Sequence, residues 1–364
     1  MIRSSVWTLV FATIILLGTF VLVAEMGASP QQAARVAKSS GSEAALNDDA
    51  VTITSVAKAR AALRRQIWGE AELPGTVPVV TTLQPAAPEW AKVTSKMALK
   101  SADFERVDKL SFALAAGQSS VGYLFTAKES KRLVIVHQGH GCTFGPAGAG
   151  LQRLIGELLS NGYSVVALYM PRPADCGGNL VAYHAQLFQQ VSGKLRGSPL
   201  QLFVEPVVQT VNYALKSGYA RVDMVGLSGG GWTTTVAAAV DPRIKLSVPV
   251  AGSFPRQLPC GINVNDPEQD AIASYLNLYV LGSLGAGRRQ IQVLNEYDRC
   301  CFKVKCDRPQ HDNQPDIESY ERLVQDADQK LGVGNFSVHI DFDSHQHQIS
   351  AKVTHDVILP ALKQ

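Results

Sequence analysis

Short runs of aliphatic and β-branched residues alternate with longer segments of helical periodicity from about residue 96 onward. Regular alternation of strand and helix implies a parallel sheet covered by helices on both faces. The predicted fold class is therefore α/β, with a mostly parallel sheet of eight strands flanked by helices. The pattern predicts strands at 104–114, 119–127, 131–138, 163–170, 221–227, 244–252, 288–296 and 336–342, and helices at 147–160, 200–218, 230–240, 316–331 and 349–362.

Other stretches lack a sustained apolar period. Residues 171–199 and 253–287 are predicted to be irregular insertions between the periodic elements. Closer to the N-terminus, Val56, Leu63 and Ile67 are spaced for one face of a short helix, and the Pro-punctuated stretch 73–90 is predicted to be irregular. The sequence therefore predicts a linker and N-terminal arm over 25–95, packing on a main domain over 96–364.

An uncharged apolar run over residues 6–24 follows Arg3. As a helix it would reach about 28 Å, which is enough to cross a bilayer. The run is long for a signal peptide, and the small residues after it make a poor cleavage site. Two interpretations of segment 1–24 therefore remain, a cleaved signal peptide and an uncleaved membrane anchor. Both predict an exported protein, periplasmic or extracellular, with anchoring through residues 6–24 in the second case.

Composition and charge narrow the function classes. The 46% hydrophobic and 18% charged residues are typical of a globular protein. A net charge of +3 with scattered basic residues gives no electrostatic footprint for binding nucleic acid. The six cysteines lie in predicted loops, so disulfide bonds near the candidate site are expected in an exported protein, with their pairing open. No C-x-x-C motif is present, which argues against metal or redox chemistry at these cysteines.

The pentapeptide Gly226-Leu227-Ser228-Gly229-Gly230 matches G-x-S-x-G between a predicted buried strand and a helix of small residues. This is the setting of a nucleophile elbow, a tight turn that holds a serine in a strained backbone conformation above the sheet. Glycines two residues before and after the serine remove side chains that would collide in such a turn. We predict Ser228 as a nucleophile, the other interpretation being a plain glycine-rich turn.

A serine hydroxyl is a weak nucleophile, so it needs a general base and a group that orients this base. Asp298 follows the seventh predicted strand, with Glu296 as the less favoured substitute because it falls within that strand. His345 and His347 follow the last strand, and His347 is favoured because it lies immediately before the closing helix. The predicted catalytic residues are Ser228, Asp298 and His347, with His345 as the alternative base.

The attacked carbonyl oxygen becomes negative during the reaction, and losing one preset donor costs about 3 kcal/mol. The N–H of Gly229, next to the nucleophile, is predicted as one donor of the oxyanion hole. The second is assigned to His140 in the loop His137-Gln138-Gly139-His140-Gly141-Cys142, with Gly141 as the alternative. Metal ligation by His137 and His140 is the alternative interpretation, but no carboxylate or cysteine pair nearby completes a ligand set, so no metal is predicted.

From residue 96 onward the chain resembles the α/β-hydrolases, with most likeness to bacterial esterases, acyl-peptidases and dienelactone hydrolases. The resemblance rests on the Ser228 elbow, the loop 137–141 and the chain order Ser, Asp, His. It implies Ser228 as nucleophile, Asp298 as acid and His347 as base. It also implies a small-molecule ester or acyl substrate and no cofactor. The stretches 171–199 and 253–287 lie where such enzymes carry lids or specificity loops, so the substrate stays open.

These residues predict a serine hydrolase that cleaves carboxylic esters, and two alternatives to this function remain. The same residues serve a peptidase or amidase, and a catalytically inactive binding protein can keep the fold. Trp232 and Phe144 are candidates for an acyl pocket or, equally, for core aromatics. Glu268 is a candidate substrate contact or an exposed turn acid.

Overall fold

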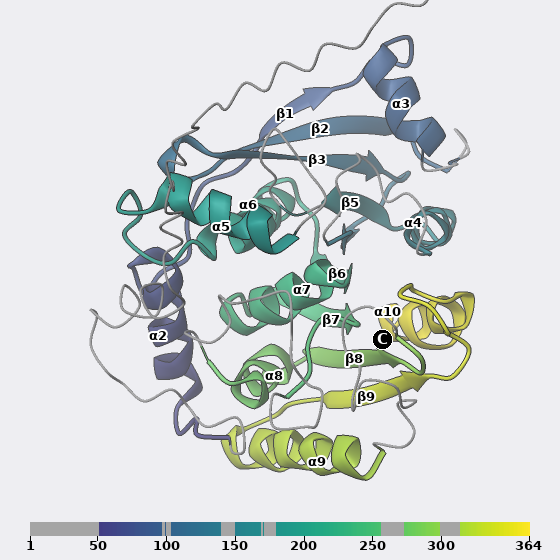
Figure 1. Ribbon diagram of the computed structural model, residues 1–364. Coiled ribbons are helices and arrows are strands. Elements are labelled where there is room, and N and C mark those ends of the chain that lie inside the picture. Colours follow the sequence, from purple (N-terminus) through teal and green to yellow (C-terminus); the bar gives the residue numbers. More distant parts are fainter. Residues whose placement is uncertain are drawn as a thin grey trace, which may run out of the picture. The chain divides into compact units, whose positions relative to one another are not determined.

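Nine strands form one sheet in the order β1-β2-β3-β5-β4-β6-β7-β8-β9 within the part of the chain that the computed structural model describes (Figure 1). That part comprises residues 51–96, 99, 103–139, 150–168, 170, 180–255, 273–298 and 314–364. The sheet is antiparallel from β1 to the β3–β5 pair and parallel from β5 to β9. The strands are β1 (Val79–Thr82), β2 (Arg106–Ala113), β3 (Ser119–Thr126), β4 (Arg132–His137), β5 (Ser164–Leu168), β6 (Arg221–Leu227), β7 (Ile244–Val250), β8 (Arg289–Asn295) and β9 (Phe336–Asp341).

Helices α6, α7, α8 and α9 pack successively against one another in a row along the sheet (Figure 1). A 3₁₀ turn occupies Ala115–Gly117, and a π-helical segment, Val353–Ile358, runs directly into α10. Every residue of α7 is buried. Its run of Gly, Thr and Ala fits this position, because small side chains allow close packing between the sheet and the neighbouring helices α6 and α8. The helices are α2 (Val56–Trp68), α3 (Pro88–Lys96), α4 (Leu151–Ser160), α5 (Leu180–Val191), α6 (Gln201–Lys216), α7 (Gly229–Val240), α8 (Tyr275–Ser283), α9 (Gln314–Leu331) and α10 (Leu359–Leu362).

The predicted α/β class is confirmed, and the structure adds elements to it. All eight predicted strands are present, and the ninth is β1, in the stretch that we expected to be irregular. Its four residues are all exposed and lack apolar alternation, so no burial pattern marks it. Helix α5 lies within 171–199, and α8 lies within 253–287. Helix α8 is buried on every side, and so it lacks the one-sided apolar stripe by which helices are recognised.

The strand order places the candidate site residues at one edge of the sheet. Strand β4 lies between β5 and β6, so the chain first crosses from β4 to the neighbour on one side and then returns to the neighbour on the other side. Ligands of open α/β sheets bind beyond the carboxyl ends of the strands at such a reversal. The parallel strands β4, β6, β8 and β9 end at this same edge, and each is followed by predicted site residues.

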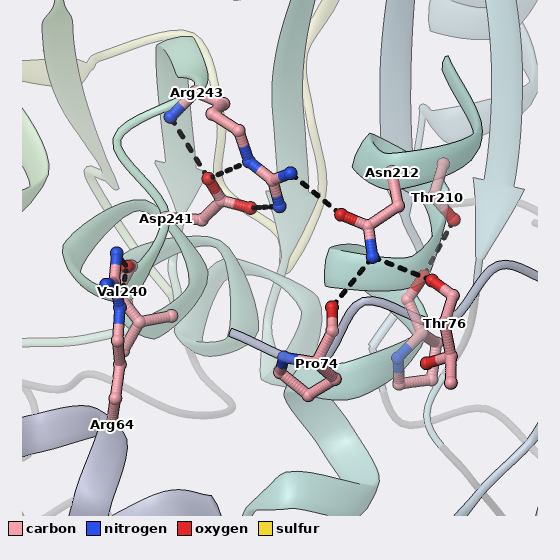
Figure 2. A network of polar contacts seen from close by, with 9 residues as sticks. Arg64, Pro74, Thr76, Thr210, Asn212, Val240, Asp241 and Arg243 are labelled. Atoms are coloured by element: carbon pink, nitrogen blue, oxygen red, sulfur yellow. Dashed lines mark hydrogen bonds and ion pairs between the residues drawn. The ribbon is translucent and has the colours of Figure 1, made fainter. Parts of the chain in front are cut away.

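Residues 51–95, within the predicted linker and N-terminal arm, contact the main sheet and its helices. The described residues fall in one compact unit, Ala44–Gln364, and β1 pairs with β2 in the main sheet. Arg64 on α2 donates from Nε and Nη2 to the carbonyl oxygen of Val240, at 2.9 and 2.7 Å. Asn212 on α6 donates to the carbonyls of Pro74 and Thr76, as Figure 2 shows. The predicted arm thus packs on the main domain: its Arg64 donates to a carbonyl at the end of α7, and its own carbonyls accept from α6.

The first unit, Met1–Glu43, lies outside the described residues, and with it the predicted signal or anchor over 6–24. Among the helices that the structure does describe, none has the length and apolar character needed to cross a membrane.

Candidate active site

Ser228 lies in the tight turn between β6 and α7. Its backbone has φ 61° and ψ −128°, outside the regions that a non-glycine residue ordinarily occupies. The Ser228 N–H donates to the carbonyl of Val250 on β7 at 2.9 Å, and the Ser228 carbonyl accepts from Trp232 in the first turn of α7. Neighbouring strand and helix thus hold the serine in a strained conformation at the carboxyl edge of the sheet, where it remains partly exposed.

The glycines around Ser228 are required by close backbone packing. A Cβ atom on Gly226 would lie 2.1 Å from the carbonyl oxygen of Gly230, and one on Gly230 would lie 2.2 Å from the carbonyl oxygen of His137. Both distances are far below van der Waals contact, and both neighbours are backbone atoms that cannot rotate away. The G-x-S-x-G spacing is therefore a steric consequence of seating the elbow directly against the end of β4.

The loop after β4 begins in contact with the elbow. Gly139 has φ 82°, and a Cβ there would lie 2.4 Å from the carbonyl oxygen of Leu227 and 3.0 Å from the N–H nitrogen of Gly229. The loop predicted to carry the second oxyanion donor therefore starts beside the first predicted donor. His140 and Gly141 themselves lie outside the described residues.

His137 is buried at the end of β4, and its Nδ1 accepts the Gly139 N–H at 3.2 Å. Burial lowers the pKa of this imidazole to about 3, from an ordinary value of 6.5, because the charged form is cut off from water. His137 is therefore a neutral acceptor that shapes the start of the loop. Within the described ranges, no group of three or more His, Cys, Asp or Glu side chains is arranged to hold a metal ion.

His347 and Asp298 form a hydrogen-bonded pair from two different strand ends. Nδ1 of His347 lies 2.7 Å from Oδ2 of Asp298, whose side chain is 1% exposed, whereas that of His347 is 22% exposed. A buried carboxylate at Nδ1 favours the tautomer with the proton on that nitrogen. Nε2 is then the ring nitrogen that can accept a proton, as a general base requires.

The two predicted substitutes have other surroundings. The exposed His345 ring stacks on Tyr297, with 4.5 Å between centroids and 16° between planes. The side chain of Glu296 is buried, and its backbone N–H donates to the carbonyl of Asp341 at 3.0 Å. The structure therefore pairs His347, the favoured histidine, with Asp298, the favoured acid. Their catalytic roles stay predictions.

Trp232 is a core aromatic residue: it is 2% exposed and packs edge-to-face on Phe203 of α6, with 5.9 Å between centroids. This agrees with the plainer of its two interpretations. Phe144, Glu268 and all six cysteines lie outside the described residues.

Sequence patterns do not reveal the side chains that hold the histidine loop, which comprises residues 341–349. Asn295, the last residue of β8, donates its amide hydrogens to the carbonyls of Gln346 and Gln348, at 3.0 and 2.9 Å. Arg153 of α4 donates to the carbonyl of Ile349 at 2.8 Å. The one signal available beforehand was a polar residue at the carboxyl end of a predicted strand.

The described chain has the α/β-hydrolase fold. Its parallel strands place a strained serine elbow after β6, an acid after β8 and a histidine after β9, in the chain order of that fold. No family model matches the sequence, and no curated protein matches it.

Several solved structures are similar to this chain. Acetyl xylan esterase 1 from Thermoanaerobacterium sp. matches with a TM-score of 0.49 and 10% identity, over 87% of this chain and 96% of that one. An acetyl xylan esterase from Paenibacillus sp. matches with a TM-score of 0.46 and 14% identity, over 87% and 98%. An esterase from Pyrococcus furiosus matches with a TM-score of 0.46 and 11% identity, over 79% and 95%. At such identities and TM-scores, these names carry no inference about the activity of this chain.

Proposed function

We propose that this protein is a serine hydrolase that cleaves carboxylic esters of small molecules. Ser228 is the nucleophile, His347 the general base and Asp298 the group that orients the base. The N–H groups of Gly229 and His140 form the oxyanion hole. The proposal needs neither a metal ion nor an organic cofactor, because these side chains supply all the proton transfers.

One observation carries the proposal: the Asp298–His347 hydrogen bond of 2.7 Å lies at the same sheet edge as the strained Ser228 turn. A carboxylate on one ring nitrogen of a partly exposed histidine supports a role in proton transfer at the other ring nitrogen. A solvated surface histidine has no need of a buried carboxylate, and a plain glycine-rich turn has no need of a strained serine.

The chemistry follows from these positions. The Ser228 hydroxyl gives its proton to Nε2 of His347 as its oxygen bonds to the ester carbonyl carbon. The resulting oxyanion accepts hydrogen bonds from the two backbone donors. When the tetrahedral intermediate breaks down, the bond to the leaving alcohol is cleaved. The alcohol takes the proton from His347, and an acyl group remains on Ser228. Water, deprotonated by His347, then attacks the acyl carbon. The bond to the Ser228 oxygen breaks, this oxygen takes the proton from His347, and the carboxylic acid is released.

Labelling with a fluorophosphonate probe tests the nucleophile. We expect one label per chain, located at Ser228 by peptide mass spectrometry, and complete loss of labelling in Ser228→Ala. His347→Ala should lower kcat for nitrophenyl acetate hydrolysis at least about 1,000-fold while leaving a measurable residual rate, whereas the matched His345→Ala should keep at least half of the wild-type rate. A folded wild-type protein that neither labels nor hydrolyses esters would favour the inactive binding protein. Faster cleavage of aminoacyl nitroanilides than of nitrophenyl esters would favour a peptidase.

We also infer from the apolar run over residues 6–24 that the chain is exported. A reporter enzyme that is active only outside the cytoplasm, fused after residue 50, should be active in cells. Removal of residues 1–24 should abolish this activity. Recovery of the full-length fusion in the membrane fraction would support an anchor, and a shortened soluble fusion would support a cleaved signal.

A further inference from the structure

One side chain, that of Asn295, makes hydrogen bonds to the backbone on both sides of His347. The Asn295 amide nitrogen donates to the carbonyl oxygens of Gln346 and Gln348, the residues before and after that histidine. Asn295 is 1% exposed and lies three positions before Asp298 in the chain. A single rigid amide at the end of β8 therefore ties the backbone that carries the histidine to the strand that leads to its carboxylate.

The orientation of this amide follows from its neighbours. Both contacts are carbonyl oxygens, so only the NH₂ end of Asn295 can face them. Its Oδ1 atom is buried and has no hydrogen-bond partner in the described part of the chain. A buried acceptor left without a partner costs about 1–3 kcal/mol. The side chain is thus placed to serve the two carbonyls and not to satisfy all of its own polar atoms.

Further contacts hold the histidine loop from both sides. The Ser344 N–H donates to the Asp341 carbonyl, and the Tyr297 N–H donates to the Ser344 carbonyl. On the α4 side, Gly150 approaches so closely that a Cβ would lie 1.8 Å from the Ile349 carbonyl oxygen. Such packing leaves the backbone from Gln346 to Ile349, which carries His347, little freedom to rotate.

We propose that Asn295 is a positioning residue for His347, acting through the two carbonyls beside it and touching no substrate. The inference rests on the proposed function, since it concerns the base of that reaction. The Nδ1–Oδ2 contact with Asp298 depends on the direction in which the His347 side chain leaves the backbone. The two hydrogen bonds from the Asn295 side chain fix that direction. Removing both bonds lets the ring drift, and misplacement by about 1 Å costs about 100-fold in rate.

Matched substitutions separate positioning from ordinary stability. Asn277 on α8 is the control: it is also 1% exposed, and its amide nitrogen donates to the side chains of Ser274 and Thr52. We expect Asn295→Ala to lower kcat for nitrophenyl acetate by about 10- to 100-fold, with KM within about twofold. Asn277→Ala, assayed at equal folded fraction, should keep kcat within about twofold.

The decisive measurement repeats Asn295→Ala in the His347→Ala background. A residue that acts through His347 has nothing left to position there, so residual hydrolysis should fall by less than about twofold. Asn295→Asp, which nearly preserves shape but removes both donors, provides the same readouts if the alanine variant does not fold. Wild-type kcat in the single variant, or an equal fold-loss in both backgrounds, overturns the inference. If His347→Ala or Ser228→Ala keeps wild-type activity, the proposed function itself has failed.

Discussion

The buried imidazole of His137 makes the stability of the folded protein depend on pH. Burial lowers its folded pKa to about 3, whereas an unfolded chain titrates near 6.5. Below pH 6.5 the unfolded chain therefore binds more protons than the folded protein does. The stability contributed by neutral His137 is fully present above pH 6.5 and is lost progressively as the pH falls toward 3.

The size of this loss follows from the difference in pKa. Each pH unit in the window removes about 1.4 kcal/mol, so about 3 kcal/mol is gone at pH 4.5. That is a large share of an unfolding free energy of about 5–15 kcal/mol. Asp328 acts in the opposite direction, because burial raises its pKa from 3.8 to about 6. Its contribution grows as the pH falls from 6 to 3.8, so only a comparison of variants isolates His137.

His137→Asn is the suitable perturbation. The asparagine side chain offers an oxygen to the Gly139 N–H that now donates to Nδ1 at 3.2 Å, and it does not titrate. We would measure the free energy of unfolding in urea at pH 7.0, 5.5 and 4.5 for both proteins. The wild-type value minus the variant value should fall by about 3 kcal/mol between pH 7.0 and 4.5. A difference that is constant with pH would refute the assignment of acid sensitivity to this ring.

Two further substitutions test how the loops and the N-terminal helix are held. Gly150→Ala introduces a side chain at φ 78° and against the Ile349 carbonyl, so we expect kcat to fall at least about 10-fold. Gly156→Ala, within α4, meets no atom within 4 Å and should raise stability by about 0.5–1 kcal/mol with kcat unchanged. Equal kcat in the two variants would contradict the expectation for Gly150→Ala. Arg64→Ala removes both donors to Val240 and should cost about 1–2 kcal/mol in urea unfolding. Its kcat should stay within twofold, since the serine elbow lies at the other end of α7, and a parallel loss of kcat would show that this reasoning is wrong.

The sequence predicted the central sheet because the parallel strands β4 to β8 are almost wholly buried. The β4 segment, RLVIVH, is a continuous aliphatic run whose burial can be read directly from its composition. Strand β1 has no such signal, because it is a short, fully exposed edge strand stabilised by its pairing with β2. Its existence depends on a partner far along the chain, which a local pattern does not contain.

The candidate site likewise contains one feature that the sequence reveals and one that it does not. The Ser228 turn was predictable because steric crowding requires Gly226 and Gly230, and this requirement leaves a visible spacing in the sequence. Asn295 leaves no comparable trace. Its two acceptors are main-chain carbonyls, which any residue type provides, so nothing at positions 346 and 348 reveals the contact.

The attachment of α2 to the end of α7 has a practical consequence for anyone producing this protein. A shortened version that starts at residue 96 would strip away Leu63, Ile67 and Trp68, three side chains of the hydrophobic core. It would also leave the Val240 carbonyl without its guanidinium partner. Such a fragment should aggregate, whereas one that begins near residue 51 keeps every contact described for the hydrolase fold.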